Sequence, residues 1–423
     1  MGDETAIKKA HRAAQQKYAD AGVDSDIAIR TLAGKSISLH CWQGDDLAGF
    51  EKSGKRLPGG GLQVTGKYPG RARNAGELRA DMGKAFSLVP GRHRANLHAI
   101  YGEFGDKPAK RDEIGYRHFR GWVGWARKLG IGLDFNATLF SHPLAESGFT
   151  LSSKDNVTRK FWIGHVKQCR QIASEIGREL GTPCIHNLWL PDGMKDTCID
   201  RGGFRANLLE SLDEIYSVKY SPEYIKDSIE PKLFGIGSES YVVGSHDFYM
   251  GYALSRGIML CVDMGHYHPT ESVADKISSI LHFSPELALH LSRGVRWDSD
   301  HVVLFDDQMR EVAHEIVRNG ALGRVHLSLD YFDGSINHVG AWVAGARAAL
   351  KSILFALLEP TGKLVKLESV GNYSERLALL EELKTMPFGA VWDYYCLKTG
   401  VPAGEDWIKE TMSYEKKTAG RKS

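Results

Sequence analysis

The feature that most constrains the fold is an alternation of short apolar runs with stretches of helical spacing, repeated eight times. The runs are 37–42 (ISLHCW), 95–100 (ANLHAI), 131–136 (IGLDFN), 184–190 (CIHNLWL), 233–239 (LFGIGSE), 258–263 (IMLCVD), 287–292 (LALHLS) and 325–330 (VHLSLD). Strands and helices that alternate along a chain predict a parallel α/β sheet. Eight such units predict a closed (β/α)₈ TIM barrel. An open doubly wound sheet is the alternative, and the run 287–292 could instead end a helix that begins near Ser284.

The chain of 423 residues is long for an average domain but within the range of barrels that carry insertions. After the eighth run the sequence is strongly helical. We therefore expect a catalytic barrel at 1–338 and a C-terminal helical extension at 339–423 that serves packing or oligomerisation. Residues 44–94 are glycine-rich and then helical, which predicts a long insertion after the first strand, where barrel enzymes carry loops that form sites.

The composition excludes several classes of protein. A net charge of +2 provides no strong field for nucleic acid or an anionic membrane. No apolar run approaches the roughly 20 residues of a membrane span, and the charged N-terminal segment does not resemble a signal peptide. The six cysteines form no C-x-x-C pair, which argues against a cysteine-built zinc site and suits a reducing compartment. We expect a cytoplasmic protein without nucleic-acid or membrane partners.

Acidic and histidine residues end the last four runs or follow them closely. They are Glu239, Asp263, His266, His290, Asp298, Asp300 and Asp330. Each alone could be a helix cap, a turn residue or a core histidine. Active sites of barrel enzymes lie at the carboxyl ends of the strands, so the whole set on neighbouring strands indicates a site. Carboxylates and imidazoles without a thiolate suit Mn²⁺, Mg²⁺, Co²⁺ or Zn²⁺, and this many ligands indicates two ions.

The stretch VRWDSDHV places Asp298 and Asp300 two residues apart, so that on an extended chain both carboxylates would point the same way. Like charges at that separation repel each other. A divalent cation between them would offset the repulsion. The sequence has no G-x-G-x-x-G after a strand and no phosphate-binding G-x-x-x-x-G-K-[ST], so we expect no nucleotide cofactor.

The motifs SLHCWQGDD, TGKYPGRARN, GLDFN with FSHP, NLWLPDGMKD, FGIGSESY, DMGHYHPTE, VRWDSDHV and LDYFDGSIN occur in this order, within a resemblance that runs from about residue 10 to about residue 415. Together they resemble bacterial L-rhamnose isomerase, whose barrel is similar to that of xylose isomerase. The resemblance implies interconversion of L-rhamnose and L-rhamnulose in the cytoplasm by a homotetramer. It implies Mn²⁺ as the cofactor, with Zn²⁺, Co²⁺ or Mg²⁺ as alternatives at one site.

The resemblance also assigns roles to residues. The ligands of a catalytic ion fall on His266, Asp298 and Asp300, and those of a second, structural ion fall on Glu239, Asp263, His290 and Asp330. Asp330 counts as a catalytic candidate as well. Relatives carry a lysine two positions after the glutamate of the fifth strand, where this chain has Tyr241. The proton-shuttling role of that lysine then falls to Lys195 or to water.

Two further groups complete the predicted site. His98, at the end of the second run, resembles the ring-opening histidine of related isomerases and has a suitable pKa class. Trp42, Phe140 and Trp189 lie at strand ends or in strand loops, where they could form an apolar wall against the methyl group of a deoxy sugar.

Two ions favour a hydride shift between C2 and C1 of the open-chain sugar over a proton-transfer enediol route. The nearest alternative function is isomerisation of another aldose. A dinuclear metal hydrolase on the same barrel is a second alternative, and a non-catalytic sugar-binding protein is a third, which has no need of two ions.

Overall fold

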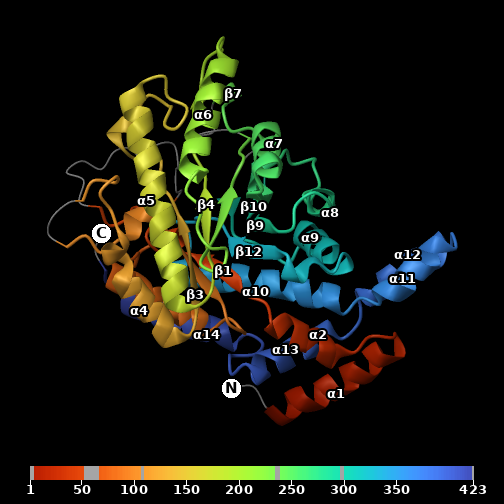
Figure 1. Cartoon of the computed structure of the whole chain (residues 1–423). Helices are drawn as coiled ribbons and strands as arrows, with labels where there is room; N and C mark the ends of the chain where they lie inside the picture. Colours follow the sequence, from red (N-terminus) through yellow and green to blue (C-terminus); the bar gives the residue numbers. More distant parts are fainter. Residues whose placement is uncertain (1–3, 52–65, 106–108, 234–238, 296–299, 422–423) are drawn as a thin grey trace.

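The computed structural model shows a closed barrel of parallel strands surrounded by helices (Figure 1). It describes residues 4–51, 66–105, 109–233, 239–295 and 300–421. The barrel strands are β1 (Ile37–His40), β2 (Arg94–His98), β3 (Gly132–Asn136), β4 (Cys184–Leu188), β6 (Ile225–Ile229), β8 (Met259–Asp263), β9 (Leu287–Leu291) and β12 (Val325–Leu329). Each pairs in parallel with the next, and β12 pairs with β1. The predicted TIM barrel is confirmed, and the open sheet is excluded.

One helix of the outer layer follows each barrel strand. These helices are α3 (Ala75–Phe86), α4 (Arg120–Leu129), α5 (Asn156–Leu180), α6 (Arg201–Tyr216), α7 (His246–Arg256), α8 (Ala274–Leu281), α9 (Asp307–Arg318) and α10 (His338–Leu357). The bounds of α5 follow from its sequence. The Asp155 side chain accepts hydrogen bonds from the first free amides of the helix. Gly181 ends the helix at a φ of 66°, which glycine adopts most readily.

The fifth barrel strand is β6, and its predicted position at 233–239 was wrong. β6 has the sequence IKDSI, so Lys226 and Asp227 interrupt the apolar run that marks the other strands. Both side chains are paired: Asp227 accepts a hydrogen bond from Arg170 at 2.8 Å, and Lys226 donates to Glu286 at 2.6 Å. Tertiary pairing of this kind cannot be read from local periodicity.

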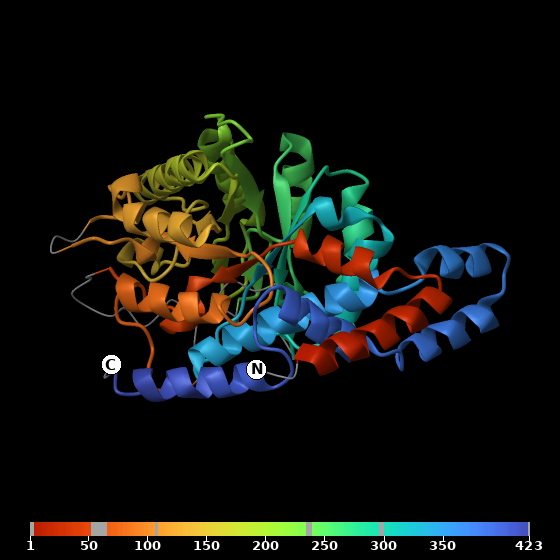
Figure 2. The same ribbon diagram turned by 90° about the horizontal axis from the view of Figure 1, so that it is seen from below.

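Six more helices lie in the described residues at the two ends of the chain. They are α1 (Glu4–Asp20), α2 (Ser25–Ala33), α11 (Thr361–Ser369), α12 (Tyr373–Leu383), α13 (Phe388–Lys398) and α14 (Asp406–Thr418). Among them α1, α2 and α13 pack side by side, and the His11 ring of α1 stacks on Tyr394 of α13 with centroids 3.8 Å apart. The hairpin of α11 and α12 stands away from the barrel in both views (Figure 2). The predicted C-terminal helical extension is confirmed.

α10 belongs to the outer layer of the barrel, because it packs on α9 and α3 and its Trp342 indole donates a hydrogen bond to the His40 carbonyl at 2.8 Å. By length and composition α10 could cross a membrane, but 78% of its most apolar window is buried inside the fold. The predicted segment 339–423 thus includes a barrel helix, and the division into two domains stays a prediction. The predicted insertion at 44–94 contains α3, and its residues 52–65 lie outside the described ranges.

Two small antiparallel sheets accompany the barrel. β5 (Gly193–Met194) pairs with β7 (Tyr241–Val242), and β10 (Arg293–Gly294) pairs with β11 (Asp300–His301). Because β10 begins two residues after β9 ends, the second sheet stands at the carboxyl end of the barrel. It brings Asp300 opposite Gly294 and so returns the chain toward the strand ends.

Candidate active site

Four side chains with metal-binding groups meet at the carboxyl end of the barrel. Glu230 follows β6, Asp263 ends β8, His290 lies in β9 and Asp330 follows β12, and one ligand atom of each lies within 4.8 Å of the others. His290 Nδ1 is 3.1 Å from Asp330 Oδ2, 3.3 Å from Glu230 Oε2 and 3.6 Å from Asp263 Oδ2. Asp263 and His290 are register partners on adjacent strands, so the pairing of β8 with β9 fixes their contact.

This group places three carboxylates around one imidazole, so its negative groups outnumber its positive one. Burial would raise the pKa of Glu230, but His290 and His266 hold it well below its usual value. Burial alone would lower the pKa of His290, but the carboxylates around it, Glu230, Asp263 and Asp330, raise it well above its usual value. Asp263 Oδ2 is buried without a hydrogen-bond partner in the described part of the chain. Such an oxygen is costly unless a positive group compensates it, and carboxylate and imidazole donors fit a hard or borderline divalent cation.

A second group of potential ligands shares Asp263 with the first. Asp263, His266 and Asp300 offer atoms within 4.8 Å of one another. His266 ends the 3₁₀ turn η5 (Met264–His266), which follows β8 directly, and the β10–β11 hairpin supplies Asp300. The approach is close, since a Cβ on Gly265 would lie 2.6 Å from Asp300 Oδ1. Asp298, which was predicted to join this group, lies outside the described residues.

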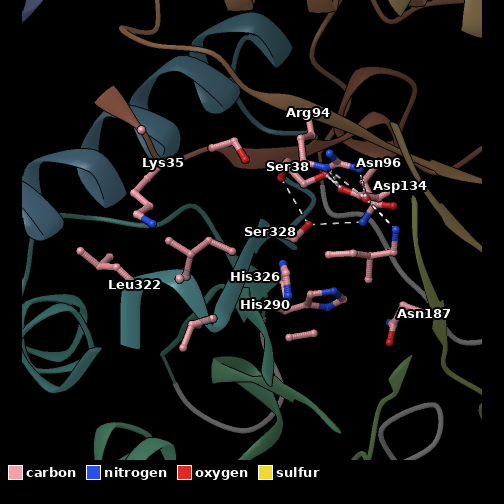
Figure 3. A pocket seen from close by; sticks show the side chains of 17 residues that line it. Lys35, Ser38, Arg94, Asn96, Asp134, Asn187, His290, Leu322, His326 and Ser328 are labelled. Carbon is pink, nitrogen blue, oxygen red and sulfur yellow. Dashed lines mark hydrogen bonds and ion pairs between the residues drawn. The ribbon is translucent and has the colours of Figure 1, made fainter. Parts of the chain in front are cut away.

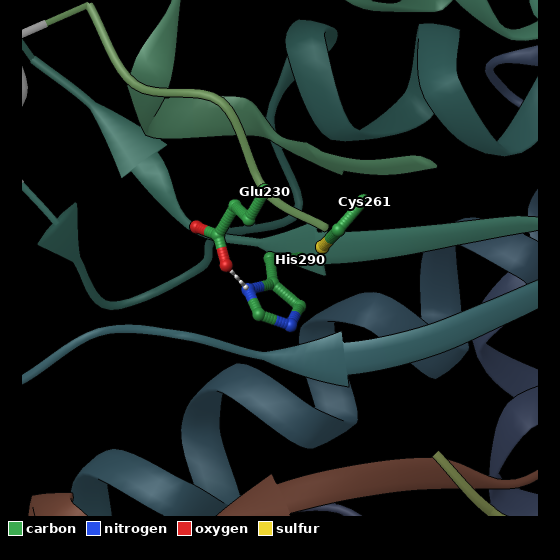
Figure 4. Close-up of side chains that lie close together, drawn as sticks. All are labelled: Glu230, Cys261 and His290. Atoms are coloured by element: carbon green, nitrogen blue, oxygen red, sulfur yellow. Dashed lines mark ion pairs between the residues drawn. The ribbon is translucent and has the colours of Figure 1, made fainter. Parts of the chain in front are cut away.

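Cys261 lies beside the first group and was not predicted there. Its Sγ and ligand atoms of Glu230 and His290 lie within 4.8 Å of one another (Figure 4). Burial raises the pKa of the thiol to about 12, so Cys261 is a neutral thiol at pH 7. The search for C-x-x-C pairs could not find it. Its signal is the two-residue spacing from Asp263, which puts both side chains on the same face of β8.

A cavity of about 50 Å³ adjoins the two ligand groups, and we call it the carboxyl-end cavity. The predicted residues Trp42, His98, Phe140 and Trp189 all line it. The His98 ring lies 4.8 Å from the Trp42 ring and 5.5 Å from the Phe140 ring, and the Phe140 ring lies 5.8 Å from that of Trp189. The Trp42 indole donates a hydrogen bond to Asp330 Oδ1 at 3.0 Å. The aromatic wall therefore touches the ligand cluster directly.

His98 is held in one orientation. Its Nδ1 lies 3.0 Å from Thr138 Oγ1, and Thr138 in turn donates its backbone N–H to His165 Nε2 at 3.0 Å. Burial lowers the pKa of His98 to about 3. At neutral pH this ring is therefore uncharged.

Lys232 also lines the carboxyl-end cavity and was missed by the sequence analysis. Its Nζ lies 4.7 Å from the centroid of the Trp189 ring. Because β6 ends just before Glu230, the lysine expected two positions after the strand-end glutamate is Lys232, and the conclusion that Tyr241 replaces it was wrong. Tyr241 lies in β7, where its hydroxyl donates to the Arg201 carbonyl at 2.9 Å.

Two predicted site residues belong to neither ligand group as far as the described residues show. Glu239 lies beside the β5–β7 sheet, where a Cβ on Gly193 would come within 3.1 Å of its Cγ. Lys195 follows β5, is exposed, and accepts a hydrogen bond on its carbonyl from Ser240. The prediction for Glu239 depended on the misplaced fifth strand, and Lys195 was named in place of a lysine near the strand end, so both roles stay predictions.

Lowering the pH from 7 to 5 is expected to destabilise the fold. Burial lowers the pKa of His40, His98 and His165 to about 3 each. In the unfolded chain such groups titrate near 6.5, so below that pH the unfolded state binds more protons and the free energy of unfolding falls as the pH falls toward 3. Each group contributes up to about 1.4 kcal/mol per pH unit. Thermal melting followed by circular dichroism tests this, and equal melting temperatures at pH 7 and 5 would contradict it.

A parallel barrel with potential metal ligands and an aromatic cavity at the carboxyl ends of its strands is the arrangement of a barrel enzyme. The family model described as L-rhamnose isomerase (RhaA) matches residues 5–422. L-rhamnose isomerase of Rhodopirellula baltica is 54% identical over 417 residues, covering 99% of this chain and 97% of that protein. L-rhamnose isomerase of Escherichia coli K12 is 52% identical over 418 residues, covering 99% of each. The chain therefore belongs to the L-rhamnose isomerase family of aldose–ketose isomerases, and the resemblance seen in its motifs is confirmed.

Solved structures offer more distant likenesses. A structure of L-ribulose 3-epimerase aligns with a TM-score of 0.46 at 13% identity, covering 79% of this chain and 98% of that one. This similarity is too low to carry an argument about the site.

Proposed function

We propose that the chain interconverts L-rhamnose and L-rhamnulose by moving a hydride between C2 and C1 of the open-chain sugar, with divalent ions bound. The observation that carries the proposal is the pair of ligand groups sharing Asp263 beside an aromatic cavity. Family membership supports the substrate, and the ligand chemistry supports the ions. Mn²⁺ is the proposed ion, with Zn²⁺, Co²⁺ or Mg²⁺ as alternatives at one site.

The residues that would hold the ions are proposed from this geometry. One ion would bind to Glu230, Asp263, His290 and Asp330. The other would bind to Asp263, His266 and Asp300, joined by Asp298 from outside the described residues. When bound, divalent cations supply Lewis acidity, which polarises a sugar carbonyl and eases the loss of a neighbouring hydroxyl proton.

His98 is proposed to open the sugar ring. From the wall of the carboxyl-end cavity its imidazole would pass a proton between the anomeric hydroxyl and the ring oxygen. The Thr138 contact keeps the ring turned toward one position in the cavity. Lys232, at the cavity wall over Trp189, is placed to donate a proton or hydrogen bond to a sugar oxygen at the reacting end.

Trp42, Phe140 and Trp189 are proposed to receive the apolar end of the substrate. L-rhamnose carries a methyl group where most hexoses carry a hydroxymethyl, and burial of that methyl against aromatic rings favours it. A hydroxyl at the same position would lose water without gaining a partner. Phe140 meets Trp189 edge to face, and His98 joins Phe140 to Trp42 in the same way, so the positions of the rings depend on one another.

Incubation of the purified protein with L-rhamnose and Mn²⁺ tests the proposed function, with L-rhamnulose as the expected product. Other aldoses and a phosphate ester are assayed in parallel, and phosphatase activity without isomerisation would overturn the proposal. In tritiated water a hydride shift leaves the transferred hydrogen mostly unexchanged. Heavy label at C1 of the product would instead support an enediol route.

Replacing Thr138 with valine is expected to slow ring opening more than hydrogen transfer. Valine keeps the shape but removes the hydroxyl that contacts His98 Nδ1. Loss of one buried hydrogen bond should lower turnover about tenfold. Because ring opening then limits the rate, the isotope effect measured with L-rhamnose deuterated at C2 should shrink toward one. Thr138→Ser keeps the hydroxyl and is the control, and an unchanged isotope effect in the valine variant would count against a ring-opening role.

We also propose a cytoplasmic homotetramer. The hairpin of α11 and α12 exposes Val365, Val370, Tyr373 and Leu377, each by more than half of its surface. Apolar side chains gathered on a projecting element are typical of an interface. Light scattering is expected to give the mass of four chains of 46.9 kDa, and the double variant V370D/L377D should lower it if the hairpin makes the contact. A wild-type mass of one chain would refute the assembly.

A further inference from the structure

A second cavity enters the barrel from its amino-terminal end, and we call it the amino-end cavity. It has a volume of about 180 Å³. Residues at the starts of strands form its mouth. Lys35 lies just before β1, and Arg94 and Val325 are the first residues of β2 and β12. Its inner end reaches His290 and Asn187 (Figure 3). Asn187 lines the carboxyl-end cavity as well, so this side chain separates the two cavities.

The lining of the amino-end cavity is polar where barrel interiors are ordinarily filled by layers of branched apolar side chains. Ser38, Asn96, Asp134 and Ser328 face it (Figure 3). The Ser38 hydroxyl donates to Asp134 Oδ2 at 2.6 Å, and the Asn96 amide donates to the Ser328 hydroxyl at 3.3 Å. A polar cavity of this size has room for water.

The inner wall of the cavity is tied to the ligand cluster. Asn187 Nδ2 donates a hydrogen bond to Glu230 Oε2 at 2.5 Å, and Asn187 Oδ1 accepts one from the Ser228 hydroxyl at 2.9 Å. The three ion pairs of His290 all run through Nδ1, toward Glu230, Asp263 and Asp330. If Nδ1 binds an ion, the ring proton sits on Nε2 at the other side of the ring and needs an acceptor.

We propose that the amino-end cavity is a water site built against the back of His290, in which ordered water accepts the Nε2 proton and so fixes the ring for ion binding through Nδ1. The inference rests on the proposed function, since it takes His290 as an ion ligand. It adds a binding site for water at the end of the barrel opposite the carboxyl-end cavity. Partners of this kind orient metal-binding histidines, and their loss typically costs 10- to 100-fold in metal affinity.

Ala288 offers the substitution that separates water from packing. It lines the amino-end cavity two residues before His290 on β9 and is buried. The large apolar side chain of Ala288→Leu would fill the cavity and displace water. The small polar side chain of Ala288→Ser would leave the cavity open and polar. Neither change touches a residue proposed to bind the ion or the sugar.

The experiment titrates the ion-free protein with Mn²⁺ and follows the electron paramagnetic resonance signal of the free ion. Wild type and Ala288→Ser are expected to bind with the same affinity, and the dissociation constant of one ion is expected to rise about tenfold in Ala288→Leu. Circular dichroism of the ion-free proteins reports folding separately. If the leucine variant does not fold, Ala288→Val takes its place. Valine fills part of the cavity, and its dissociation constant for Mn²⁺ is likewise expected to rise.

The outcomes are distinct. Unchanged affinity in Ala288→Leu, or equal weakening in the serine and leucine variants, would overturn the water site and leave the proposed ion ligands standing. A wild-type protein that binds no Mn²⁺ would overturn the proposed ligand role of His290, and the water site with it. Weakening confined to the filled cavity supports both.

Discussion

Asp300→Asn is expected to lower turnover by about a hundredfold or more while the protein remains folded. The substitution keeps the size of the side chain but removes one negative charge from the group formed with Asp263 and His266. Asp300 lies in the short β10–β11 hairpin and not in the barrel, so loss of its charge should not disturb the strands. Steady-state kinetics with L-rhamnose and a thermal melt of the same preparation measure the two effects.

Asp263→Asn is the informative comparison. Asp263 ends β8, is 1% exposed, and accepts hydrogen bonds from the Gly265 amide and the Ser292 hydroxyl at its Oδ1. Since it takes part in both ligand groups, its loss should reduce activity and melting temperature together. Near-normal turnover in Asp300→Asn would mean that the hairpin is only a charged loop. Equal loss of stability in both variants would contradict the separation of roles.

Removal of divalent ions with a chelator is expected to abolish turnover and lower the melting temperature by about 5 °C. An ion present at a thousand times its dissociation constant stabilises the folded state by about 4 kcal/mol. Its removal leaves three carboxylates, Glu230, Asp263 and Asp330, around one imidazole.

Addition of Mn²⁺ in excess of the chelator should restore both activity and melting temperature, which excludes irreversible damage as the cause of the loss. An ion-free protein with an unchanged melting temperature would argue against a stabilising role for the group around His290.

Much of the architecture could be predicted because seven barrel strands lie in apolar runs that local periodicity detects. The fifth could not, because Lys226 and Asp227 of β6 are neutralised by partners from other elements. One misplaced strand then affected the predicted site. It drew attention to Glu239, so that Glu230 and Lys232, which follow the real strand, were not named.

The carboxyl-end residues could be predicted because barrel topology places all strand ends together. His290, Asp263 and Asp330 were predicted because their strands were placed correctly, and the structure brings the three side chains into contact. Cys261 could have been found from its two-residue spacing to Asp263 on one face of β8. Asn187 had no such signal, because its contact with Glu230 depends on the pairing of β4 with β6.

Asp263 belongs to both ligand groups, and this has a thermodynamic consequence. A carboxylate shared between two sites makes occupation of one depend on occupation of the other, and the coupling free energy is the same in both directions. If the first ion orders the carboxylate for the second, the two ions bind cooperatively and protein with one ion is scarce. If the two ions compete for the carboxylate, protein with a single bound ion accumulates. The availability of ions in the cell would then set how much of the enzyme is active, without any change in its amount.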